Sequence, residues 1–322
     1  MLEPIVNYFE DRQDIDKEAL EYQGNKIYDY HTYPVLNYYD VSNYTNTPEK
    51  GKRYFGLEIE REINRDNFYD NLDHTDEDLT YPEFHSFEAC QTLLIWLYEQ
   101  KFHTLEDYVW TSRDSSITYG LEFITHPCTV DYWLSTPVLE SICDKLSTTS
   151  DHYETGLHIH VSNNFNKIQQ CLIVLFITVH KDIFEVFAGR QENEYCLHED
   201  LYLLSRNVKN LSKSSRTFRK LYDTLAIERN SAVNITSIKP TIEFRLFKSS
   251  VDVSHLKNCI VFCDSICNFI SKIYKRSSND SYEQISAMRI NKDKEFKEYM
   301  DYLKSIPAYN PLYKELLNIQ NT

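Results

Sequence analysis

Four short segments alternate apolar and polar residues, and their polar positions carry groups that bind metal ions or phosphate. The segment FGLEIE starts at Phe55 and places Glu58 and Glu60 on one face of a predicted strand. The same alternation gives the other three segments a polar face, with Glu122 in ITYGLEF, His158 and His160 in GLHIHVS, and Glu243 and Arg245 in TIEFRLF.

Carboxylates that share one face of a sheet repel each other unless cations hold them together. Oxygen-rich sites with an imidazole suit Mg²⁺ or Mn²⁺, and nearby arginines would then bind an anion such as phosphate. Gly56, Gly120 and Gly156 each lie two residues before one of these Glu or His residues. A glycine on a sheet face allows another group to approach the backbone closely there.

Each motif also has an ordinary structural interpretation. Two glutamates on a strand can form a solvated polar face, two histidines can be a hydrogen-bonded pair at a sheet edge, and Glu243 with Arg245 can be a same-face salt bridge. The four motifs together favour a single site over four unrelated surface features.

Hydrophobic periodicity predicts an α+β fold in which helices pack on an antiparallel sheet with half-buried strands. Residues 1–50 are expected to form a Tyr-rich arm, with residues 51–322 as the catalytic domain. Strands are predicted at 54–62, 117–124 and 156–162, and a hairpin at 231–238 and 241–247. Helices are predicted near 15–22, at 87–100, 130–146, 167–187, 201–223 and 253–274, and as two short elements that close the chain.

Composition excludes several classes of protein. The chain has 322 residues with 42% hydrophobic residues, so it is long and apolar enough to bury a core. Only 6 glycines are present and neither GxxxxGK[ST] nor GxGxxG occurs, which argues against the common phosphate-binding loops. A net charge of −15 disfavours general binding to nucleic acid or to anionic membranes.

The cysteines favour a reducing compartment and hence a cytoplasmic protein. None of the 8 forms a CxxC motif, and Cys259, Cys263 and Cys267 recur every four residues, as small apolar residues do on one helix face. The most apolar run, Cys171–Val179, is too short to cross a bilayer.

The order and spacing of the motifs resemble the amidoligase family of the glutamine synthetase and glutamate–cysteine ligase superfamily. The resemblance rests on FGLEIE, DSSITYGLEFITHP, TGLHIHVS and an ERN string ahead of TIEFR, and it spans roughly residues 53–250. It implies a glutamine synthetase-like fold whose concave sheet face binds metal and nucleotide. It also implies an ATP-dependent carbon–nitrogen ligase that uses Mg²⁺ or Mn²⁺. The low glycine and high tyrosine content would suit an AT-rich bacterial or phage genome.

The resemblance also implies roles for individual residues. Glu60 and Glu122 would hold one ion, with Asp114 at a position where the superfamily often has a further acidic ligand. The second ion would be held by Glu58, His158 and Glu243. The nucleotide phosphates and the transferred phosphoryl group would be contacted by His160, Arg245 and Arg229.

The implied reaction joins a carboxylate to an amine through an acyl phosphate and forms an amide or isopeptide bond. Small molecules, peptides or protein side chains could supply the two substrates, and self-association is left open. One alternative is a small-molecule phosphotransferase of the guanidine kinase type on the same fold. Another is a non-catalytic binding protein on a ligase scaffold.

Residues 201–222 form a second feature that stands out in this acidic chain. They include six basic residues and no acidic one, and Arg216 belongs to the basic face of the predicted helix. This face could simply be solvated, or it could clamp ATP phosphates or an acidic substrate. Contact with nucleic acid is the minor third interpretation.

Overall fold

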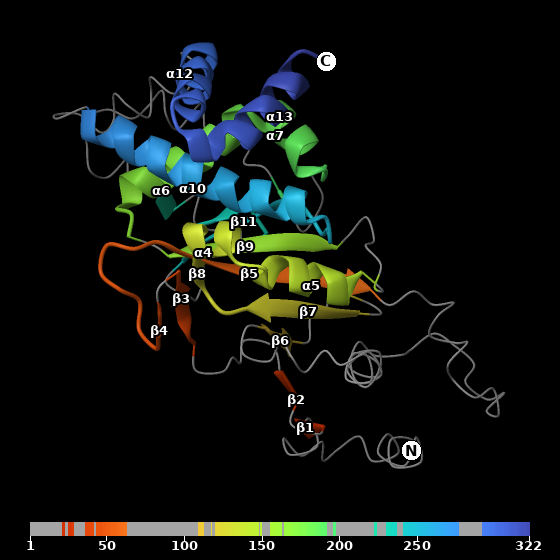
Figure 1. Cartoon of the computed structure of the whole chain (residues 1–322). Coiled ribbons are helices and arrows are strands. Elements are labelled where there is room, and N and C mark those ends of the chain that lie inside the picture. Colours follow the sequence, from red (N-terminus) through yellow and green to blue (C-terminus); the bar gives the residue numbers. More distant parts are fainter. Residues whose placement is uncertain are drawn as a thin grey trace.

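The computed structural model shows one mixed sheet with helices gathered on one side of it (Figure 1). Strand β5 (Tyr54–Glu62) is central and pairs antiparallel with β7 (Gly120–Thr125) and β9 (Gly156–Ser162). The structure describes residues 21–22, 25–28, 36–41, 43–62, 109–112, 117, 120–147, 149, 155–162, 164–191, 196–197, 222–223, 230–236, 241–276 and 292–322.

The strands that carry the motifs follow the predicted pattern closely. β5 and β9 have the predicted bounds, whereas β7 starts three residues later and ends one residue later than expected. The predicted hairpin is present as β10 (Val233–Asn234) and β11 (Thr241–Lys248), and β11 also pairs antiparallel with β9.

The sheet is mixed and mostly antiparallel, so the prediction of an antiparallel sheet is correct only in part. Two pairs are parallel, β2 with β6 and β3 with β8. Their partners lie far apart in the sequence, and the residue pattern within a strand does not encode the direction of such a distant neighbour. The strands involved are β2 (Asn25–Tyr28), β3 (Tyr38–Asp40), β6 (Val109–Ser112) and β8 (Cys128–Thr129).

Strands from the expected N-terminal arm join this sheet. Besides β2 and β3, the structure has β1 (Glu21–Tyr22) and β4 (Asn43–Thr45), which pair with β2 and β3. The helix predicted near 15–22 is therefore wrong at its last two residues, and its other residues lie outside the described part. Tyr39 of β3 is buried against Tyr132. The division between arm and catalytic domain at residue 50 stays a prediction.

Two predicted long helices are each split into two. The 130–146 helix breaks at Thr136 and Pro137, because proline disfavours helical backbone before it and cannot donate its own backbone hydrogen bond. The 167–187 helix breaks at His180, whose backbone (φ −111°, ψ 20°) leaves the helical region. The resulting helices are α4 (Val130–Ser135), α5 (Val138–Leu146), α6 (Lys167–Val179) and α7 (Lys181–Ala188).

The remaining predicted helices have mixed outcomes. The one predicted at 253–274 is α10 (Val253–Arg276), and the two closing helices are α12 (Lys292–Lys304) and α13 (Asn310–Gln320), joined through a 3₁₀ turn at Pro307–Tyr309. The helices predicted at 87–100 and 201–223 lie outside the described residues, except that 222–223 are helical.

The core lies between the sheet and the helices. Phe55, Leu57 and Ile59 of β5 and the alternate residues of β9 are fully buried on the face that the helices cover. Cys259, Cys263 and Cys267 of α10 are buried and free, which confirms their prediction as small apolar residues of one helix face. Alternation along the strands then sends Glu58, Glu60, His158 and His160 to the opposite face.

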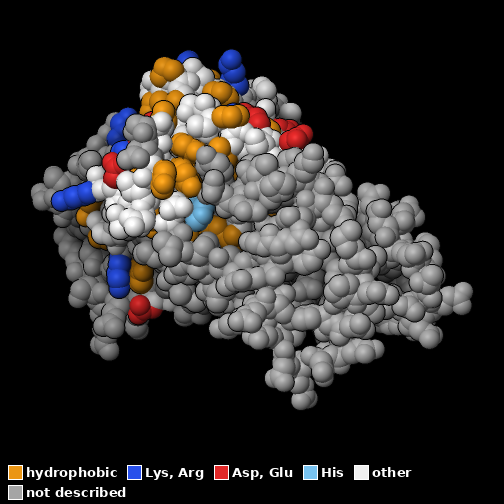
Figure 2. Space-filling view, turned by 60° about the horizontal axis from the view of Figure 1, so that its bottom comes forward, with side chains coloured by type: hydrophobic (Ala, Val, Ile, Leu, Met, Phe, Trp, Pro, Cys, Tyr) orange, Lys and Arg blue, Asp and Glu red, His pale blue; other side chains and the backbone are white. Residues whose placement is uncertain are grey.

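The described part of the chain contains no helix with the length and apolarity needed to cross a membrane. Figure 2 shows one face of the molecule, on which the described Lys and Arg side chains lie singly near the rim and hydrophobic side chains gather toward the middle.

Candidate active site

The register of three neighbouring strands brings the predicted site residues together. Glu58 lies opposite His158 across β5 and β9, and Glu60 lies opposite Glu122 across β5 and β7. On the other side of β9, His160 lies opposite Glu243 of β11. Directly opposed side chains on one sheet face have Cβ atoms about 4.5–5.5 Å apart, so these groups must interact.

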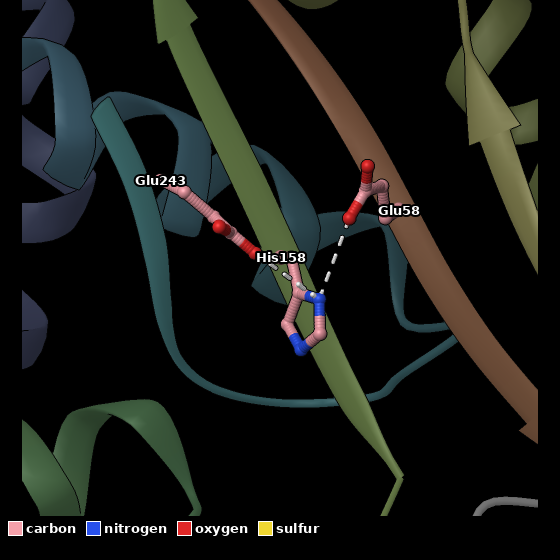
Figure 3. A group of neighbouring side chains, drawn as sticks. All are labelled: Glu58, His158 and Glu243. Atoms are coloured by element: carbon pink, nitrogen blue, oxygen red, sulfur yellow. Dashed lines mark ion pairs between the residues drawn. The ribbon is translucent and has the colours of Figure 1, made fainter. Parts of the chain in front are cut away.

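Among the described residues this gives two groups of potential metal ligands, and His158 belongs to both. One consists of Glu58, His158 and Glu243, and the other of Glu60, Glu122 and His158; within each group the ligand atoms lie within 4.8 Å of one another. Figure 3 shows the first group, with the imidazole of His158 between the two carboxylates. Its Nδ1 is 3.5 Å from Oε2 of Glu58 and 3.7 Å from Oε1 of Glu243. Its Nε2 is 3.4 Å from Oε1 of Glu60.

His160 extends the first group along β9. Its Nε2 is 2.9 Å from Oε1 of Glu58 and 3.9 Å from Oε1 of Glu243. Its Nδ1 lies 3.0 Å from the hydroxyl of Thr241, which fixes the plane of the ring. Both histidines therefore contact the same two carboxylates from successive positions on one face.

Glu243 is the best connected carboxylate at this end of the site. The guanidinium of Arg245 donates to its Oε1 at 2.5 Å, and the amide of Asn234 donates to its Oε2 at 2.9 Å. Burial by itself raises the pKa of Glu243, but the charges of His160, Arg245 and His158 outweigh burial and hold the pKa below its usual value. Glu243 is therefore ionised at neutral pH.

The described part of the site has more acidic than basic groups. Glu58, Glu60, Glu122 and Glu243 are each at most 7% exposed. The guanidinium groups near them belong to Arg245 and Arg190. The four carboxylates outnumber these two guanidinium groups by two, and buried charges without counter-ions are strongly unfavourable.

A divalent cation fits this arrangement. Carboxylate oxygens with one imidazole are the ligand set that Mg²⁺ or Mn²⁺ takes, and one such ion would balance the two surplus charges. Nε2 of His158 is buried and makes no hydrogen bond, although Oε1 of Glu60 lies 3.4 Å away, as expected of a nitrogen that binds a metal ion together with that carboxylate. The residues present therefore suit a divalent metal ion.

Of the glycine predictions, the one at Gly156 is confirmed. A Cβ there would lie 2.2 Å from Nη1 of Arg190 and 3.1 Å from Nε2 of His158. At Gly56 a Cβ would meet only the carbonyl oxygen of Thr125 at 3.7 Å, an ordinary contact, so no described protein group makes a close approach there. A close approach of another group to the backbone of Gly120 stays a prediction.

Among the described residues of this site, Arg190 is a charged residue that the sequence analysis missed. It follows Gly189, whose left-handed backbone (φ 67°) ends α7, and no strand alternation marks it. The weak signal available was Gly156 itself, which predicts that some group fills its place. Asp114, Arg216 and Arg229, the other predicted site residues, lie outside the described part of the chain.

The fold is α+β, and its sheet has a buried cluster of carboxylates and histidines with two arginines beside it. Such a cluster suits the binding of a charged ligand. The family comparison is more specific, because residues 36–267 match the family model of amidoligase enzymes. The match covers more than half of the chain, so this protein belongs to the amidoligase family, whose name denotes ligase-type enzymes. It extends beyond the 53–250 span of the motifs at both ends. No curated protein matches the sequence.

Proposed function

We propose that this protein is an ATP-dependent carboxylate–amine ligase that works with Mg²⁺ or Mn²⁺ and forms an amide or isopeptide bond. The observation that carries the proposal is the buried surplus of carboxylates around His158, next to Arg245, in a member of the amidoligase family. We further propose that the sheet is the glutamine synthetase-like catalytic sheet and that its polar face binds the nucleotide.

The two ligand groups would have separate roles. Glu58, His158 and Glu243 would hold one ion, and Glu60 with Glu122 would hold a second, with Asp114 as a further candidate. Bound ions would neutralise the oxygens of the nucleotide phosphates during phosphoryl transfer. Two ions would turn the local surplus of two negative charges into a surplus of two positive charges, which suits a polyphosphate.

Arginine would complete the phosphate site. Arg245 presents a planar guanidinium whose paired N–H groups match the oxygens of a transferring phosphoryl group. Glu243 holds that guanidinium in place through their hydrogen bond, so the fork is oriented before substrate binds. Arg229 and Arg216 are proposed as additional contacts to the phosphates, and His160 as a neighbour of the nucleotide.

The chemistry needs no nucleophilic side chain. A carboxylate attacks the γ-phosphorus of ATP, so that a C–O–P bond forms while the bond to ADP breaks. The amine nitrogen then attacks the acyl carbon, the new C–N bond forms, and inorganic phosphate leaves with the electron pair of the C–O bond. The amine loses a proton in this step, and a carboxylate of the site is the proposed acceptor.

The test is a product analysis with ATP, Mg²⁺ and pooled carboxylates and amines. The proposal expects ADP and phosphate to appear together, to depend on both substrate pools, and to accompany a new product whose mass is the sum of the substrates less one water. Glu58→Gln should abolish all three signals. A stable phosphorylated product that forms without any amine would instead identify a phosphotransferase.

A further inference from the structure

The first residue of β9 is a glycine, Gly156, so the polar face of the strand has no side chain at that position. By alternation, Gly156 points to the same face as His158 and His160. Its backbone N–H donates a hydrogen bond to the Glu60 carboxylate, and across the sheet it pairs with Lys248 of β11. The position therefore lies directly beside the Glu60 group of potential metal ligands.

The guanidinium of Arg190 fills this empty position. A Cβ on Gly156 would lie 2.2 Å from Nη1 and 3.1 Å from Cζ of Arg190. The guanidinium of Arg190 therefore occupies the space that a side chain at position 156 would take. Arg190 is only 4% exposed. It reaches the sheet from the end of α7, where Gly189 turns the chain.

From this place Arg190 connects two parts of the site. Its Nη1 donates to the backbone carbonyl of Arg245 at 3.2 Å, which ties it to the middle of β11. Burial lowers the pKa of Arg190, and the charge of Glu60 opposes that shift. A guanidinium remains charged even when buried, and the Glu60 carboxylate accepts a hydrogen bond from the backbone of Gly156, the residue on which this guanidinium lies, so the positive charge of Arg190 is held close to Glu60.

We propose that Arg190 is a positioning residue, which holds Glu60 at the metal site and β11 with Arg245 at the phosphate site by occupying the side-chain position left empty at Gly156. This inference rests on the proposed function for what the site binds, but the geometry that it invokes can be tested without metal or substrate. It assigns the glycine at 156 a specific purpose, because a side chain there would force the guanidinium of Arg190 to move.

The first test is a pair of double-mutant cycles, read as melting temperatures with excess chelator. Gly156→Ala should lower the melting temperature of the wild type by several degrees and have little effect in the Arg190→Met background, where the space is free. Gly56→Ala, the matched control, should cause little change in either background. If Gly156→Ala costs the same in both backgrounds, the proposed packing is wrong.

The second cycle asks whether Arg190 acts on Glu60. Arg190→Met should lower the melting temperature much less when Glu60→Gln is already present, since no buried carboxylate then loses its counter-ion. An equal loss in both backgrounds would overturn the positioning role. This cycle is also measured with chelator, so it decides the inference even if the metal part of the proposed function fails.

A spectroscopic test separates positioning from general stability. At saturating Mn²⁺, Arg190→Lys should change the electron paramagnetic resonance spectrum of the bound ion, because lysine keeps the charge but lacks the fork that reaches the Arg245 carbonyl. Asp264→Asn, which changes a carboxylate of α10 in the helix layer, should leave the spectrum unchanged. An unaltered spectrum in Arg190→Lys would count against the proposal. Failure of the wild type to bind Mn²⁺ would refute the metal site itself.

Discussion

Two buried polar clusters of this protein differ in charge balance. In the first, Asp264 of α10 accepts hydrogen bonds from Arg53 at 2.9 Å, from Asn268 at 3.1 Å and from the hydroxyl of Tyr309 at 2.6 Å. It contains one carboxylate and one guanidinium. In the second, at the candidate site, four carboxylates surround two guanidinium groups.

The difference separates a structural network from a candidate binding site. The Asp264 network is neutral and satisfies both oxygens of its carboxylate, so it needs nothing from outside the chain. In the candidate site the carboxylates outnumber the guanidinium groups by two, and burying that excess is favourable only if further positive charge, from the histidines or from a bound cation, balances it. Charge balance, rather than burial or polarity, is therefore the property that distinguishes the candidate site from the Asp264 network.

The largest expected effect comes from breaking the balanced cluster. Asp264→Ala leaves Arg53 and Tyr309 without their acceptor and should cost about 3 kcal/mol of unfolding free energy, the lower end of the range for a broken buried pair because Arg53 is partly exposed. Urea unfolding in chelator measures the loss. The stabilisation by Mn²⁺ should persist in this variant, and its disappearance would show that the two clusters are not independent.

A buried histidine outside both clusters gives the next effect. Burial and the charge of Lys292 lower the pKa of His180 to about 4, partly opposed by Asp293, while the unfolded chain keeps the ordinary value of 6.5. The unfolded state therefore binds more protons between these values. Stability is full above pH 6.5 and should fall by about 3 kcal/mol as the pH drops to 4.

The control for this prediction is His180→Phe, which suits the neighbouring rings of Phe176 and Phe296. Its unfolding free energy should depend less on pH over that interval than that of the wild type. Two parallel pH profiles would mean that another group controls the acid sensitivity.

Replacing one arginine in each cluster by lysine should affect turnover in the candidate site and stability in the Asp264 network. The expected change in the activation barrier is similar in size to the preceding effects. Arg245→Lys keeps the charge but loses the planar fork, and we expect turnover to fall at least ~100-fold, or roughly 2.7 kcal/mol of barrier, with ATP binding kept. Arg53→Lys in the balanced cluster should reduce stability and leave turnover almost unchanged. Near-normal turnover in Arg245→Lys would refute its proposed contact with the phosphoryl group.

The smallest effect is linkage of metal binding to folding. At a free Mg²⁺ or Mn²⁺ concentration ten times the dissociation constant, the ion should stabilise the protein by about 1.4 kcal/mol. Calorimetry with and without chelator measures the shift, and Glu58→Gln should remove most of it. The metal assignment fails if neither ion changes the melting temperature.

Prediction from sequence succeeded where local patterns control the structure. The bounds of β5 and β9, the hairpin of β10 and β11, and the face of α10 with its cysteines all follow from periodicity, which reports what a residue packs against. The breaks at Pro137 and His180 were missed, although proline gave a visible signal at the first. Periodicity is insensitive to a short interruption between two helices that bury the same face.

The sequence by itself determined which side chains share a face, because alternation along a strand is a property of the backbone. Only the tertiary structure decided which strands are neighbours, and hence that His158 serves two carboxylate groups and that Glu60 lies opposite Glu122. The tertiary structure alone places Arg190, at the end of α7, in the space beside Gly156 that a side chain would otherwise fill. Contacts between distant segments depend on the packing of the whole core, which no local pattern of residues encodes.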